Sequence, residues 1–306
     1  MNIDLLPDIL LAMLGGAIRV GTPFLFVSLG ECITEKSGRI NLGLEGVLVF
    51  SAMAGFAGSL WSGSAWLGVL AAAMAGGVLG AMHGLLCSLT RVNDIAMGIG
   101  LMLFGTGLAF YFGKPLIQPQ AAQLMSIPLG TLSDSPKVVQ ALSINPLFPI
   151  GVILALMLNW AFKNTRWGLK LRMVGDSSQA ALAIGASVIR ERILATCYGG
   201  FIAGIGGASL SLYYPGSWNE GLSSGQGLIA VALVIYARWN PVNCLYAALV
   251  FGGAGALGPA LQSVGVSKGY NLFNAIPYAL TLLILILTCS PNRTIKGSPS
   301  ELSVAR

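Results

Sequence analysis

The sequence has 306 residues, of which 55% are hydrophobic and only 9% are charged, and its mean hydropathy is +0.78. A soluble domain has about 25% charged residues, so this composition excludes an ordinary soluble protein and indicates an integral membrane protein whose apolar surface faces lipid. The formal net charge of +6 comes from basic residues that form no stripe or motif, which argues against nucleic-acid binding and agrees with basic cytoplasmic loops.

The apolar segments predict an all-α, polytopic transmembrane bundle. A helix needs about 17–25 apolar residues to cross a bilayer. Nine such segments cover residues 9–30, 42–62, 65–90, 94–113, 146–163, 191–213, 225–238, 242–260 and 271–290. The seventh segment is short for a full crossing and follows a run rich in glycine and serine, which is typical of one part of a broken helix. Because no polar linker divides the chain, we expect one domain over residues 1–306.

The distribution of basic residues predicts the orientation, because cytoplasmic loops are enriched in lysine and arginine. When segment 163–192 is placed in the cytoplasm, thirteen basic residues fall on that side: Lys36, Arg39, Arg91, Lys163, Arg166, Lys170, Arg172, Arg190, Arg192, Arg238, Arg293, Lys296 and Arg306. The outer side receives three, Lys114, Lys137 and Lys268. We therefore expect the N-terminus outside, the C-terminus in the cytoplasm, and residues 114–145 as an external loop. Residues 1–8 carry two aspartates and no basic residue, so we expect no cleavable signal peptide.

Glycines recur at helical spacing in two of the predicted spans. Gly76, Gly80 and Gly84 lie on one face of the third span, and Gly200 and Gly204 repeat the pattern in the sixth. Small residues at this spacing allow two helix backbones to approach closely. We interpret them as helix-packing residues.

The sequence lacks the usual motifs of a catalytic site. It contains no phosphate-binding GxxxxGK[ST] loop and no HExxH. The five cysteines are scattered, and His83 is the only histidine, which we interpret as a packing residue and not a metal ligand. These absences argue against a membrane enzyme, and we expect no bound cofactor. An ion-coupled secondary carrier stays open as an alternative, although only Glu31, Glu45 and Glu220 could supply its membrane carboxylates.

The cytoplasmic segment between the fifth and sixth spans has the pattern of a short capped helix. Asp176 or Ser177 can cap a helix over 177–184, with Gln179 at the capping-box position three residues after Asp176. Gly185 suits the position just beyond its end. Two interpretations remain open at this point, a helix resting on lipid headgroups and a helix that docks into a cytoplasmic partner.

Several stretches resemble one known family. They are Glu35–Gly46 (EKSGRINLGLEG), Thr165–Arg172 (TRWGLKLR) followed by Val174-Gly175-Asp176 and Ala180-Ala181, Gly225–Ala232 (GQGLIAVA) followed by Arg238-Trp239-Asn240-Pro241, and Ile276-Pro277-Tyr278. In this order they are similar to the permeases of bacterial ABC importers, in the branch that serves simple sugars, nucleosides and branched-chain amino acids. The nucleoside-type permeases resemble the chain most, and within them the shorter of two subunits.

The resemblance implies an importer that moves a small polar solute by alternating access. It implies a cytoplasmic ATPase that binds ATP and Mg²⁺ and receives residues 176–185 in a surface cleft. It also implies an extracytoplasmic solute-binding protein, a second related permease chain, and a location in the bacterial plasma (inner) membrane among its lipids. The residues it assigns to ATPase coupling are Val174, Gly175, Asp176, Gln179, Ala180, Ala181, Ile184 and Gly185. We expect a nucleoside as the solute, with a simple sugar as the next candidate.

Five residues are candidates for the translocation pathway. Asn41 can cap the helix that follows it and leave free backbone N–H groups at its start. Glu45 is an ionisable group near the start of a span, with Arg19 as a candidate partner and pairing at the cytoplasmic rim as the alternative. Trp218 and Glu220 lie in an aromatic stretch that either contacts solute or forms an interfacial belt. Gln226 stands where the related permeases usually have an arginine.

Overall fold

The computed structural model describes residues 6–89, 92–128, 139, 143–263, 273, 275–288 and 297–304. The helices it describes are α1 (Leu6–Lys36), α2 (Leu44–Ser62), α3 (Ala65–Leu86), α4 (Asp94–Gly113), α6 (Leu147–Asn164), α7 (Arg166–Asp176), α8 (Ser178–Ala183), α9 (Val188–Leu212), α10 (Gln226–Tyr236), α11 (Pro241–Ser263), α13 (Ile276–Thr288) and α14 (Glu301–Val304). A 3-10 helix, η2 (Lys114–Leu116), and a small antiparallel pair, β1 (Ile127–Pro128) with β2 (Ser143–Ile144), complete them. Arg91, Lys137, Lys268, Cys289, Arg293, Lys296 and Arg306 lie outside the described residues.

The all-α membrane architecture predicted from composition is confirmed. Seven helices are long and apolar enough to cross a membrane, namely α1, α2, α3, α4, α6, α9 and α11. The remaining two predicted spans contain α10 with 11 residues and α13 with 13 described residues. Both are shorter than the 17–25 residues of a full crossing. The exact number of nine spans is therefore not confirmed.

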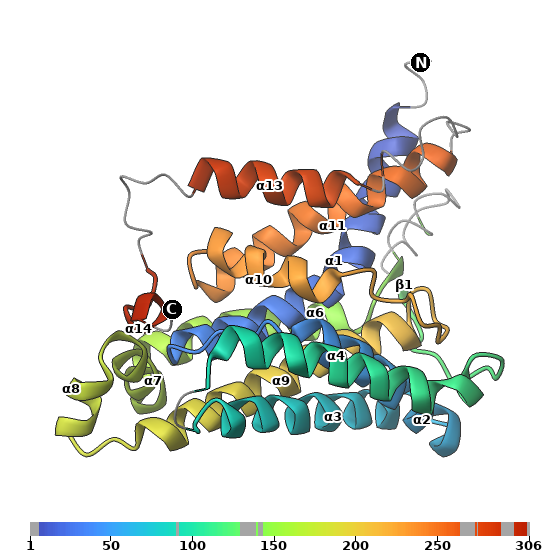
Figure 1. The fold of residues 1–306 in the computed structure, drawn as a ribbon. Coiled ribbons are helices and arrows are strands. Elements are labelled where there is room, and N and C mark those ends of the chain that lie inside the picture. Colours follow the sequence, from blue (N-terminus) through green and yellow to red (C-terminus); the bar gives the residue numbers. More distant parts are fainter. Residues whose placement is uncertain are drawn as a thin grey trace.

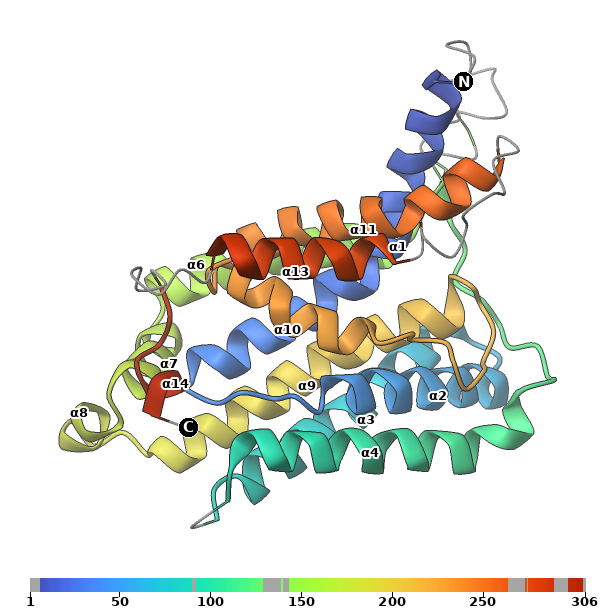
Figure 2. The same ribbon diagram turned by 45° about the horizontal axis from the view of Figure 1, so that its top comes forward.

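The helices form two layers that α1 connects. In Figures 1 and 2, α2, α3, α4 and α9 lie on one side, α10, α11 and α13 lie on the other, and α1 crosses between them. Helix α9 packs against α3, α1 and α2, while α1 also packs against α11. The start of α1 lies at the end of the bundle opposite α7, α8 and α14 (Figure 1), as expected if the two chain ends face opposite sides of the membrane.

The contact between α3 and α9 depends on glycine, as the spacing predicted. A Cβ added at Gly76 would lie 2.3 Å from the carbonyl oxygen of Gly200, and one at Gly80 would lie 2.2 Å from that of Thr196. Such distances are far below van der Waals contact, and the obstructing atoms belong to the backbone. The two helices therefore cannot keep this separation with a larger residue at either position.

We expect Gly80→Ala to destabilise the protein by about 1–3 kcal/mol, the usual cost of overpacking a close contact. Gly100→Ala is the matched control, because a Cβ at Gly100 in α4 meets nothing within 4 Å. It should be neutral or slightly stabilising, since alanine favours helix by about 0.5–1 kcal/mol. Thermal unfolding of the purified variants in detergent measures both effects. Equal melting temperatures for the two variants would contradict the glycine-dependent contact.

Helix α1 extends six residues beyond the predicted end of the first span. The added residues include the polar side chains of Glu31, Thr34 and Glu35, which are buried inside the bundle. Glu35 accepts a hydrogen bond from Nε1 of Trp239, and Glu31 accepts one from the backbone N–H of Asn41 at 2.8 Å. The sequence pattern marked these residues as the end of an apolar run and missed their interior partners.

Other buried polar groups fasten the turn between α1 and α2 to its neighbours. Arg39 forms an ion pair with Asp94, at the first residue of α4. His83 is fully buried and its Nε2 lies 3.1 Å from the carbonyl oxygen of Ile40. This agrees with the interpretation of His83 as a packing residue.

Candidate functional site

The segment between α6 and α9 forms a helical corner at one end of the bundle. The sequence predicted one short helix over 177–184, but the structure has two helices there, α7 and α8. Thr165 begins α7, because its Oγ1 accepts a hydrogen bond from the N–H of Gly168 at 3.1 Å. Ser177 begins α8 and accepts one from the N–H of Ala180 at 3.2 Å. Of the two predicted caps Ser177 is therefore correct, and Asp176 is wrong because it is the last residue of α7.

The eight residues predicted for ATPase coupling divide into two groups. Val174, Gly175 and Ala181 are buried, whereas Asp176, Gln179, Ala180, Ile184 and Gly185 are exposed. Val174 and Ala181 pack together and with Val188 of α9, so they fix the corner from inside. A Cβ at Gly175 would lie 2.2 Å from the carbonyl oxygen of Lys36, so any substitution of Gly175 tests packing against α1 and not docking.

The tip of the corner exposes apolar side chains. Leu182 is 60% exposed and Ile184 is 64% exposed. Gly185 follows with φ of +81° and turns the chain back toward α9, a conformation that favours glycine. Leu182 was absent from the predicted set, because the sequence pattern did not distinguish the exposed face of this short helix from the face that carries the buried Ala181. Exposed apolar residues on a capped helix indicate a contact surface for another molecule.

A second candidate site, which is polar, lies at the start of α10 and centres on Glu45. The Glu45 carboxylate accepts hydrogen bonds from the backbone N–H groups of Gly225, at 3.0 Å, and Gly227, at 2.7 Å, and from the hydroxyl of Ser223. A negative charge at this place satisfies otherwise unpaired N–H groups and interacts favourably with the helix dipole. Gly227 allows the approach, since a Cβ there would lie 2.5 Å from the Cα of Glu45.

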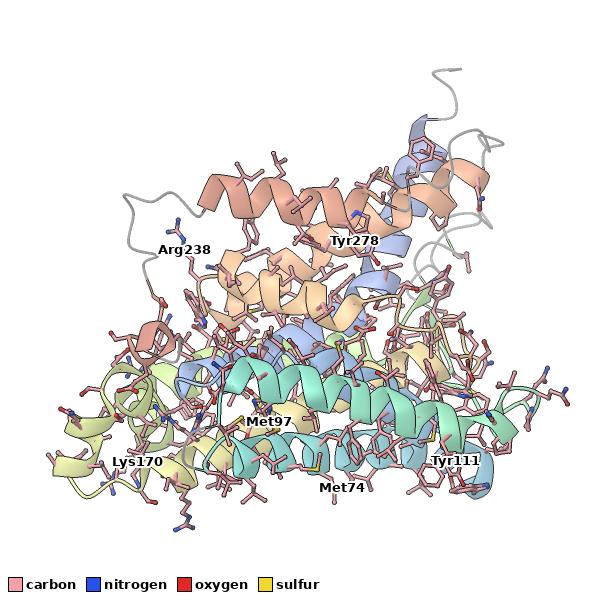
Figure 3. All side chains as sticks on the ribbon, in the orientation of Figure 1. Met74, Met97, Tyr111, Lys170, Arg238 and Tyr278 are labelled. Atoms are coloured by element: carbon pink, nitrogen blue, oxygen red, sulfur yellow. The ribbon has the colours of Figure 1, made fainter. Side chains whose placement is uncertain are left out.

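This site lies about one length of α10 away from the basic end of the bundle. The 11 residues of α10 rise about 16 Å, which is roughly half of a hydrocarbon core about 30 Å thick. Arg238, which follows α10, lies toward the same end as Lys170 of α7, and Tyr111 of α4 lies at the opposite end (Figure 3). The start of α10 is therefore about half a bilayer away from the basic end, and Glu45 is there with it.

Two predictions about this region are wrong. Arg19 is not the partner of Glu45, because its guanidinium lies 5.4 Å from the ring centroid of Tyr214. Asn41 also does not cap α2, because its Oδ1 accepts from the N–H of Gly43, which precedes that helix.

The remaining pathway candidates lie in different surroundings. Trp218 is buried and packs against Gly113 at the end of α4, so its indole neither forms a belt nor faces an open path here. Glu220 is exposed. Gln226 is the first residue of α10, and its buried Oε1 has no hydrogen-bond partner in the described part of the chain. The structure therefore brings Gln226 near Glu45 and leaves Trp218 at another place.

The sequence also missed a tyrosine at this site. The hydroxyl of Tyr278, on α13, donates a hydrogen bond to the carbonyl oxygen of Ser224, and Figure 3 shows Tyr278 on α13 above α10. Its place in a resembling motif near the last span was the available signal. Among the described residues, no group of three or more histidine, cysteine, aspartate or glutamate side chains could hold a metal ion.

Comparison with known proteins identifies relatives over most of the chain. A family model described as "Branched-chain amino acid transport system / permease component" matches residues 13–288. The protein TsgC13 of Haloferax volcanii, whose name describes a glucose ABC transporter permease, is 34% identical over 85% of this chain and 80% of its own length. The nucleoside ABC transporter permease NupC of Lactococcus lactis is 27% identical over 87% and 88%. The guanosine ABC transporter permease NupQ of Bacillus subtilis is 26% identical over 91% and 92%.

Proposed function

Because this chain belongs to the permease family of branched-chain amino acid transport systems, we propose that it carries a nucleoside, or next a simple sugar, across the membrane by alternating access. The family and the relatives make it a non-catalytic, multi-pass ABC transporter permease of the sugar and nucleoside type, in the plasma (inner) membrane. Such a permease works with an ATPase and a solute-binding protein. The solute and the way in which the chain works are the proposal.

The exposed tip of α8 carries the proposal for coupling. Leu182 and Ile184 present apolar side chains from a helix that Ser177 caps and that Ala181 fastens to the bundle. A rigid apolar tip suits insertion into a groove of the partner ATPase, since burial of such side chains drives association. ATP and Mg²⁺ would bind to the ATPase. Its closure would move α8, and α7 and α9 would transmit the movement to the bundle.

The start of α10 supports a pathway that a second permease chain completes. Around the Glu45 site, Ser224 is exposed, and Leu228 and Tyr278 are 44% and 46% exposed. A carboxylate inside the membrane normally faces protein or a water-filled cavity and not lipid. A related permease chain that covers this face would enclose the site, and solute would pass between the two chains, while lipid covers the other apolar faces.

Hydrogen-bonding groups at this site fit a solute rich in hydroxyl groups. Oε2 of Glu45, which accepts one hydrogen bond, and Oε1 of Gln226, which accepts none among the described residues, have acceptor capacity left, and the Ser223 hydroxyl, which donates to Glu45, can still accept. Such groups suit a ribose or hexose better than an apolar amino-acid side chain. The nucleoside preference follows NupC and NupQ, and the sugar alternative follows TsgC13.

Reconstitution tests the proposed function directly. The permease, its partner permease and the ATPase are placed in liposomes, and the binding protein is added with nucleosides, pentoses, hexoses or branched-chain amino acids. We expect ATP-dependent uptake and ATPase stimulation with nucleosides. Stimulation by amino acids alone would overturn the proposed solute. Uptake that needs no ATPase and follows a proton or sodium gradient would instead favour the secondary carrier.

A further inference from the structure

Residues 297–304, here called segment 297–304, contact the helix that the proposed function assigns to ATPase coupling. The carboxylate of Glu301 uses both of its oxygens. Oε1 accepts a hydrogen bond from the backbone N–H of Ser178, the first residue of α8, at 2.8 Å. Oε2 forms an ion pair with Nη2 of Arg192, in the first turns of α9, at 3.1 Å. One side chain therefore joins the start of α8 to the start of α9.

The same network extends to the end of α1. Nε of Arg192 donates a hydrogen bond to the carbonyl oxygen of Ser37 at 3.1 Å. Gly38, with φ of +81°, follows Ser37 in this turn, and a Cβ added there would be 2.8 Å from the Cβ of Glu301 and 3.3 Å from the Cα of Gly175. The turn after α1, the end of α7 and segment 297–304 thus pack with no space for a side chain between them.

Segment 297–304 also contacts the turn after α10. A Cβ at Gly297 would lie 3.1 Å from the carbonyl oxygen of Arg238, which follows α10. Leu302 packs against the main hydrophobic core. The segment therefore contacts the basic end of α10 with one part and the start of α8 with another.

The charge of Glu301 suits this position. Burial pulls the pKa of Glu301 upward, but hydrogen bonds from Ser178 and the positive charge of Arg192 outweigh this and hold the pKa below its ordinary value. Glu301 is consequently ionised at neutral pH, and its two contacts are charge-assisted.

We propose that segment 297–304 links α8 to the end of α10. Glu301 is the positioning residue through which α8 and the rest of the bundle move together when the ATPase closes. This inference rests on the proposed role of α8 in coupling. It requires that loss of Glu301 leaves the exposed tip of α8 able to bind the ATPase, because the described polar contacts of its carboxylate are with Ser178 and Arg192, at the starts of α8 and α9 and not at the tip. In a protein without the Glu301 carboxylate, the movement of α8 is no longer transmitted to the bundle.

The experiment compares Glu301→Ala and Glu301→Gln with the matched control Glu191→Ala. Glu191 precedes Arg192 in the chain, and no ion pair of its carboxylate is among those that the structure describes. We expect Glu301→Ala to co-purify with the ATPase and to melt at the wild-type temperature. Solute moved per ATP hydrolysed should fall at least threefold, and amide hydrogen exchange in residues 177–184 should rise about tenfold, the change for loss of a helix cap. Glu301→Gln keeps an acceptor for Ser178 and should fall between wild type and Glu301→Ala.

The readouts separate this inference from the proposed function. A wild-type coupling ratio in Glu301→Ala, or loss of ATPase co-purification in that variant, would overturn the linking role. An equal fall of the ratio in Glu191→Ala would also overturn it. If the wild-type complex itself showed no ATP-dependent uptake, the proposed function would fail first, whatever the variants did.

Discussion

Changing Leu182 and Ile184 together to aspartate is expected to abolish ATP-driven uptake and co-purification with the ATPase. Burial of one large apolar side chain contributes about 1.5–3 kcal/mol. Loss of both side chains from the interface therefore costs about 3–6 kcal/mol of binding free energy, which corresponds to roughly 10²–10⁴-fold weaker binding. Both side chains are more than half exposed in the isolated chain, so the variant should fold normally. Co-purification from detergent, together with the melting temperature, measures the effect.

The matched control is Ile117→Asp. Ile117 is 48% exposed and follows η2 at the other end of α4, away from α8. It introduces one aspartate, half the charge of the double variant, into an exposed apolar position, and we expect the ATPase to co-purify as with the wild type. If the double variant of α8 retained its ATPase and transported solute, the docking surface would lie elsewhere on the chain.

Glu45→Ala should have the second large effect, on both stability and uptake. The substitution leaves two backbone N–H groups at the start of α10 and the hydroxyl of Ser223 without their shared acceptor. Hydrogen bonds to charged groups contribute about 1.5–3 kcal/mol each, and unsatisfied buried donors add to the loss. We expect destabilisation of about 2–4 kcal/mol and a fall in uptake of at least tenfold, measured by thermal unfolding and by liposome uptake.

Two further variants separate the effect of the Glu45 charge from the effect of its single hydrogen bond with Ser223. Glu45→Gln keeps one acceptor oxygen and should restore part of the stability. Ser223→Ala removes one donor and leaves both backbone contacts intact, so its cost should be about 1 kcal/mol. A Glu45→Ala protein with wild-type stability and uptake would contradict the capping role. A rise in KM with unchanged stability would instead indicate direct contact with solute.

Local patterns were sufficient wherever the physical cause is local. The helical spacing of Gly76 and Gly80 predicted a close backbone approach, and the α3–α9 contact confirms it. Ser177 and Gly185 begin and end α8 through contacts within a few residues of themselves. Gln179 lies on α8 and Ile184 directly follows its last residue, and both are exposed, whereas the burial of Ala181 depends on α7 and α9, which the pattern did not include.

Partners far apart in the chain could not be predicted in this way. Glu45 meets Ser223 and Gly227, 178 and 182 residues later in the chain, and not Arg19. Glu301 meets Ser178 across a separation of 123 residues. A carboxylate has many sterically acceptable partners, and only the packing of the helices selects one. Trp218 shows the same limit, because its burial depends on the absence of a side chain at Gly113.

By itself, then, the sequence determined that the chain crosses a membrane, which of its segments are apolar enough to do so, and that a short capped helix lies among basic residues. Composition and helical periodicity carry this information, since lipid and backbone hydrogen bonding act on every segment separately. The tertiary structure alone decided that α10 begins about half a bilayer from the basic end, on a carboxylate from α2, and that segment 297–304 fastens α8. Both depend on how helices distant in the chain pack, because the position of a buried charge is set by the donors that packing places around it.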